Sequence, residues 1–198
     1  MRKTLAFLAL LLVTLIQPVL AQETSAPLGL KWMVSASEIE NLGVVLRPAE
    51  STAFGKTYVA TSLPKALSDM RLVMLSFGHD DRLWRIVVLG QEFANDQYGS
   101  RIMERYNQLA ASLAKNYTET GVYERKPSDT FYGRAEKFAY SLSQNEANWF
   151  RTYKSDASTV ELSANSSYQD TFWRLIYVQQ EGEKAFEASK AGTELDAL

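Results

Sequence analysis

Two extended segments with nearly the same pattern place the strongest constraint on the fold. Residues 83–88 read LWRIVV and residues 172–178 read FWRLIYV, so each has a large apolar residue, Trp, Arg and then aliphatic residues. The two tryptophans, Trp84 and Trp173, lie 89 positions apart. Apolar segments of this kind are typical of β-strands. Because each of them ends a set of three predicted strands, the pattern favours a tandem repeat of one structural unit.

Together with four other extended segments, these two predict an antiparallel sheet of about six strands. The predicted strands cover residues 56–61, 70–77, 83–89, 148–154, 159–164 and 171–179. The short segment GHDDR separates the second strand from the third, and its glycine and aspartates are typical of a tight turn. These two strands should therefore form a hairpin.

Helical signals precede each set of strands. Residues 35–38 (SASE) match a capping box, and Gly43 suits a left-handed stop, so a short helix is expected between them. Apolar residues recur every three or four positions over residues 98–117, which predicts an amphipathic helix capped by Asn95 or Asp96.

A second helix is expected in the later half, from Ser128 or Asp129 to about Leu142. Together these signals predict an α+β fold with helices packed on one face of the sheet. We expect one domain over residues 29–180, made of half-units 29–90 and 95–180. Residues 22–28 are expected to be a flexible lead-in, and residues 181–198 a polar helical or disordered tail.

The N-terminus has the three parts of a secretory signal peptide. Arg2 and Lys3 precede an apolar segment of about a dozen residues, and small residues lie near Ala21. Because about 20 residues are needed to cross a bilayer, we expect residues 1–21 to be cleaved after Ala21 rather than kept as an anchor. The mature chain is then predicted to be periplasmic or secreted, with no stable membrane insertion.

Composition excludes several classes of protein. Without residues 1–21 the chain has 19 basic and 23 acidic residues, a formal charge of −4, and no long basic run, which argues against nucleic-acid binding. The chain contains no cysteine, so disulfides cannot stabilise it and its 177 mature residues must rely on a hydrophobic core. No phosphate-binding loop and no dinucleotide-binding glycine motif occurs, and no cofactor is expected.

Candidate catalytic residues are few. The single histidine, His79, lies beside Asp80 and Asp81, and could act as an oriented base, as part of a metal pair, or simply in a hairpin turn. The turn is favoured because zinc needs three or four ligands, drawn mostly from Cys and His, and no metal site is expected. Glu38 with Glu40, or Asp80 with Asp81, would serve a carboxylate-dependent hydrolase only if folding placed two carboxyl groups at a defined separation.

Aromatic residues are the better candidates for binding. Neighbours in a strand point to opposite faces, so Trp149 and Phe150 cannot share one face, and neither can Phe172 and Trp173. If helices cover one face only, one aromatic residue of each pair lies on the open face, where tyrosine and tryptophan are favoured binding anchors. The alternative is that the C-terminal segment buries these aromatic residues fully. The predicted binding residues are Trp149, Tyr153, Phe172 and Trp173.

The opening segment GLKWMVS (residues 29–35) and the closing strand WRLIY (residues 173–177) resemble those of a loosely defined family of small bacterial exported proteins. In architecture the chain also resembles the β-lactamase inhibitor protein and the outer-membrane assembly lipoprotein BamE. This resemblance implies helices on one face of an antiparallel sheet. It does not imply membrane attachment, because the lipidated cysteine of the BamE type is missing.

Two functional hypotheses follow from the sequence. The first is an exported, non-enzymatic protein that binds another protein or an envelope component, as inhibitors, immunity proteins and assembly factors do. The second is a carboxylate-dependent hydrolase of envelope polymers. A cleft containing two carboxyl groups with strongly perturbed pKa values would favour the second hypothesis.

Overall fold

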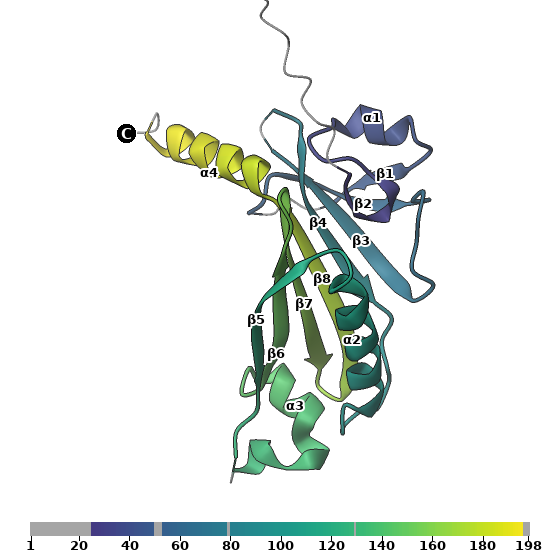
Figure 1. Cartoon of the computed structure of the whole chain (residues 1–198), viewed down its shortest axis with the longest axis vertical. Helices are drawn as coiled ribbons and strands as arrows, with labels where there is room; N and C mark the ends of the chain where they lie inside the picture. Colours follow the sequence, from purple (N-terminus) through teal and green to yellow (C-terminus); the bar gives the residue numbers. More distant parts are fainter. Residues whose placement is uncertain (1–24, 50–52, 79, 129, 196–198) are drawn as a thin grey trace, which may run out of the picture.

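The computed structural model describes residues 25–49, 53–78, 80–128 and 130–195. Their fold is α+β, with a single antiparallel sheet of eight strands (Figure 1). The strands are β1 (Val45–Pro48), β2 (Lys56–Thr61), β3 (Met70–Phe77), β4 (Leu83–Gly90), β5 (Thr118–Arg125), β6 (Asn148–Lys154), β7 (Ser158–Ser167) and β8 (Asp170–Gln179). The predicted signal peptide, residues 1–21, and His79 lie outside the described residues.

The sheet consists of two four-stranded meanders that meet in the middle. Its strand order is β1-β2-β3-β4-β8-β7-β6-β5, so the last strand of each meander pairs with the other. β4 and β8 are antiparallel, with Val87 opposite Ile176 at the centre of the pairing.

The prediction of about six strands was wrong, because the sheet has eight. The two strands that were not predicted, β1 and β5, lie at the two edges. Most of their residues are exposed, so neither shows the alternation of apolar and polar residues that reveals a half-buried strand. All six predicted strands are present, with each end within three residues of the expected position.

The helices are α1 (Ala36–Glu40), α2 (Ser100–Leu113), α3 (Phe138–Ser143) and α4 (Gln180–Leu195), with 3₁₀ turns at η1 (Pro27–Gly29), η2 (Phe131–Gly133) and η3 (Ala135–Lys137). The capping box of α1 is confirmed: the Ser35 hydroxyl accepts from the Glu38 N–H at 3.3 Å, and the Glu38 carboxylate accepts from the Ser35 N–H at 2.8 Å. Gly43 has the expected left-handed backbone, with φ of 85°.

Helix α2 begins later than the sequence indicated. Its N-cap residue is Gly99, not Asn95 or Asp96. Asp96 still serves the helix, because its carboxylate accepts hydrogen bonds from the N–H groups of Arg101 at 3.2 Å and Ile102 at 3.0 Å. These bonds satisfy donors that have no partner within the first turn.

The core lies between the sheet and helices α1, α2 and α3. Strand β8 shows the separation of its two faces, because Trp173, Leu175 and Tyr177 are buried while Phe172 and Arg174 are half-buried. Helix α2 packs against β7 and β8. In Figure 1, α2 lies beside β8, and α4 leads away from the sheet. We call the side of the sheet that carries Phe172 and Arg174 the open face.

The domain starts earlier than residue 29. Ala26 is buried, Ser25 forms a β-bridge with Lys31, and the Lys65 N–H donates to the Leu28 carbonyl at 3.0 Å. Residues 25–28 of the expected lead-in therefore pack against the fold. No helix among the described residues is long and apolar enough to span a bilayer.

Candidate functional site

The four predicted binding residues lie on different sides of the sheet. Trp173 and Tyr153 are 0% and 1% exposed and belong to the core. Trp149 is half-buried and packs edge-on against Phe138 of α3, at 5.3 Å between ring centroids. Of the four, Phe172 alone lies on the open face, where it lines a groove.

Trp173 is held by a polar network beneath the helices. Its indole N–H donates to Oδ2 of Asp69 at 2.9 Å, and Arg105 of α2 donates to both carboxylate oxygens at 2.7 and 2.6 Å. Burial opposes the ionisation of Asp69, but the hydrogen bonds from Arg105 and Trp173 outweigh it and lower the pKa of Asp69. This geometry explains why Trp173 contributes to stability rather than to a binding surface.

The open face contains an apolar groove with a cavity of about 380 Å³. Its lining residues come from β2, β3, β4 and β8 and from the loop before β2: Phe54, Thr57, Met74, Ser76, Arg85, Val87, Leu89, Phe172, Arg174 and Ile176. Ligand sites in proteins are of this size, and they are mostly apolar with a few polar groups that orient the ligand. In this groove the charged groups are two arginines.

Arg85 is the unusual group of the groove. Its side chain is half-buried, and its guanidinium lies 3.9 Å from the ring centroid of Phe54. Among the described residues, none forms a hydrogen bond or an ion pair with this guanidinium. Burial, followed by the nearby charge of Arg174, lowers the pKa of Arg85 despite the opposing effect of Glu161 and Glu183.

Arg174 is related to Arg85 by the pairing of the central strands. Arg85 lies opposite Val178 and Arg174 opposite Leu89, so the two arginines lie symmetrically on either side of the central pair of residues. Arg174 donates to the Glu161 carboxylate at 3.0 Å, while its Nε is buried without a partner in the described structure. The groove therefore contains guanidinium donors that the described residues leave unsatisfied.

Sequence reasoning did not select these arginines, although a signal was present. Both occupy the third position of the paired LWR and FWR segments, and alternation places that position on the face opposite Trp173. No sequence pattern indicated that Phe54 would line the groove, because its position depends on how the loop before β2 folds.

The carboxylates considered for hydrolysis do not form a paired site in the described structure. Glu38 is occupied in the capping box, and its hydrogen bonds from Ser35 lower its pKa. Each of five cavities described on the surface is lined by at most one carboxylate. No group of three or more potential metal-ligating residues occurs in the part of the chain that is described. The hydrolase hypothesis thus stays a prediction without a matching site there.

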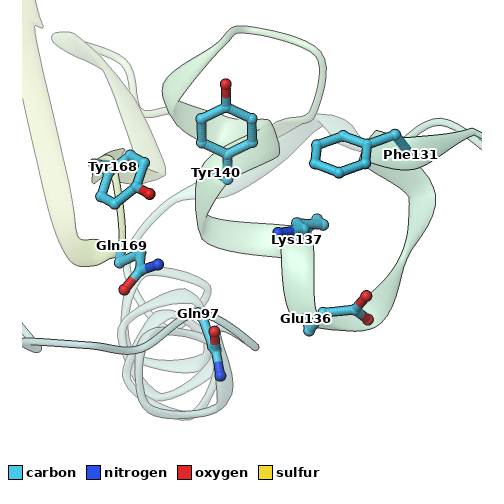
Figure 2. A pocket seen from close by; sticks show the side chains of 7 residues that line it. All are labelled: Gln97, Phe131, Glu136, Lys137, Tyr140, Tyr168 and Gln169. Carbon is cyan, nitrogen blue, oxygen red and sulfur yellow. The ribbon is translucent and has the colours of Figure 1, made fainter.

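A second cavity, of about 240 Å³, lies among α3, η2, η3 and the β7–β8 turn (Figure 2). Phe131, Tyr140 and Tyr168 place their rings around it, and Gln97, Glu136, Lys137 and Gln169 complete its lining. It shares no lining residue with the groove of the open face.

Comparison with known proteins finds no significant match to a protein-family model, to a curated protein or to a solved structure.

Proposed function

We propose that this protein is an exported, non-enzymatic binding protein of the inhibitor, immunity or assembly-factor type. Its partner is another protein or an envelope component, and it binds in the groove of the open face. The observation that carries this proposal is Arg85, a half-buried guanidinium in an apolar groove without a hydrogen bond or ion pair to the described residues.

The charge of Arg85 indicates the chemistry of the partner. A buried charge is costly unless it is paired, and a guanidinium is matched best by the two oxygens of a carboxylate or phosphate. The apolar residues around it, including Met74, Val87 and Ile176, favour an apolar group beside that anion. The partner is therefore expected to offer an acidic group next to an apolar surface.

We further propose that the two meanders are copies of one helix-plus-strands unit. Each follows a helix, α1 or α2, and their last strands pair with each other. The same relation makes Arg85 and Arg174 equivalent positions. The groove would then contain the last strand of both copies, β4 and β8, with most of its lining from the first copy.

Site-specific cross-linking tests the proposed function. A photoreactive phenylalanine analogue is placed at Phe172, in the groove, and in a separate protein at Tyr123, which is 51% exposed on edge strand β5. Both proteins are expressed with the natural leader, and cross-linking is carried out in intact cells. We expect a discrete cross-linked species from position 172 and none of the same mass from position 123.

The decisive variant is Arg85→Met, with Arg125→Met as the matched control at an exposed position. Truncating one partner of a buried charge pair costs about 2 kcal/mol or more, so we expect Arg85→Met to weaken partner binding about 30-fold or more. Its free energy of unfolding should change little, because the loss of the cation–π contact with Phe54 is offset by the removal of a desolvated charge. Cross-linking that persists in Arg85→Met, or equal cross-linking from both positions, would refute the proposal.

A further inference from the structure

The cavity in Figure 2 has features that the proposed function does not use. Four aromatic rings form a continuous cluster beside it, from Phe131, Tyr132, Tyr140 and Tyr168. Tyr132 stacks on Tyr140 at 6.0 Å between ring centroids, while Phe131 and Tyr168 meet Tyr140 edge-on at 6.2 and 5.7 Å. Phe131 and Tyr168 are exposed. Clusters of exposed rings on a monomer are uncommon and mark binding surfaces.

The backbone of Tyr168 is strained. Tyr168 and Gln169 form the two-residue turn between β7 and β8, and Tyr168 has φ of 61°, a left-handed conformation. Turns of this kind favour glycine or asparagine, because the left-handed backbone costs other residues about 1–2 kcal/mol of conformational free energy. The Tyr168 ring does not recover this cost by burial, because it is 64% exposed. Strain held at an exposed aromatic side chain points to a role in binding.

The polar groups of the cavity are available to a ligand. Gln97, Glu136, Lys137 and Gln169 line it, and their side chains form no hydrogen bond or ion pair with other residues that the structure describes. The two amides and the two charged groups supply both donors and acceptors. One positive and one negative charge leave the lining without net charge.

We propose that this cavity binds a neutral saccharide. The C–H groups on one side of a sugar ring carry partial positive charge and suit the negative face of an aromatic ring, while its hydroxyl groups need donors and acceptors. The cavity supplies both kinds of contact, from Tyr140 and Tyr168 on one hand and from Gln97 and Gln169 on the other. At about 240 Å³ it is slightly below the usual range of ligand pockets, which suits one or two sugar rings of a longer chain.

The resident charges argue against a cationic ligand. Lys137 Nζ already lies 4.9 Å from the ring centroid of Phe131, and the Arg134 guanidinium lies 5.6 Å from it. These cations occupy the position that an ammonium ligand would take over the ring.

Titration with two tetrasaccharides tests the proposal. The probes are the β-1,4-linked tetramers of glucose and of N-acetylglucosamine, which share one linkage and differ in one substituent on each ring. Calorimetry on the mature full-length protein should show binding of at least one probe. Tyr140→Ala and Tyr168→Asn should each weaken that binding about tenfold, the upper end of the value of one aromatic contact.

The controls separate a binding role from a structural one. Asparagine tolerates the left-handed backbone, so Tyr168→Asn should bind the saccharide less tightly without losing stability. Tyr123→Ala removes an exposed ring elsewhere and should leave saccharide binding unchanged, as should Arg85→Met in the groove. Absence of binding to both tetramers, or binding that Tyr140→Ala and Tyr168→Asn leave unchanged, would overturn the proposal.

Discussion

Substitution of Gly90 by alanine should destabilise the protein strongly, because the ring of Trp173 occupies the space that a side chain would need. A methyl group built on Gly90 would lie 2.5 Å from Cδ1 of that ring and still closer to Cε2 and Nε1. Real side chains do not approach so closely, so the strand or the indole must move. Gly90 lies in β4, which pairs with β8 on one side and β3 on the other, and this leaves the strand little freedom.

The expected loss of stability can be estimated from the packing and the hydrogen bond that are disturbed when the Trp173 ring moves. Overpacking a core costs about 1–3 kcal/mol. The indole N–H also loses its bond to the ionised Asp69, and a hydrogen bond to a charged group contributes about 1.5–3 kcal/mol. Because these effects overlap, we expect Gly90→Ala to lower the free energy of unfolding by about 3 kcal/mol.

Urea unfolding followed by far-ultraviolet circular dichroism measures this loss. Gly192→Ala is the matched control, because a methyl group there meets nothing within 4 Å, and alanine is the better helix former in α4. The double variant Gly90→Ala/Trp173→Leu isolates the clash, because it lacks the indole ring. Adding Gly90→Ala to the Trp173→Leu protein should lower the free energy of unfolding by about 2 kcal/mol less than adding it to the unmodified protein. A loss below about 1 kcal/mol in Gly90→Ala, or strict additivity in the double variant, would refute the packing argument.

Two further substitutions test local features of the fold. Asp69→Asn should lower stability by about 2 kcal/mol at neutral pH, since it removes the charge that Arg105 and Trp173 stabilise. The folded-state pKa of Asp69 is below its unfolded value, so this stabilisation is present above about pH 4 and is lost as the pH falls through the folded pKa. Urea unfolding at several pH values should therefore show that the stability difference between Asp69→Asn and the unmodified protein becomes smaller in acid. A stability difference that stays constant with pH would contradict this prediction. Ser35→Ala should cost about 1 kcal/mol through loss of the α1 cap and leave partner binding unchanged; loss of binding in the folded variant would show that Ser35 belongs to a site.

Local signals in the sequence determined most of the elements. The internal strands could be predicted because burial makes their apolar residues regular, and the capping box of α1 could be predicted because its bonds join residues three positions apart. Edge strands β1 and β5 could not be predicted, because their mostly exposed side chains leave no pattern. The overlooked edges account for the difference between six strands and eight.

The candidate site depended on tertiary structure to a greater degree. Alternation along β8 determines that Phe172 and Trp173 point to opposite faces, but it does not determine which face the helices cover. Packing of α2 decided this, so that Trp173 meets Asp69 and Arg105 in the core while Phe172 lies in the groove. The sequence by itself thus determined the internal strands, the helix caps of α1 and the alternation of faces, which are properties of neighbouring residues. Only the tertiary structure decided which side is open, because that depends on contacts between residues far apart in the chain.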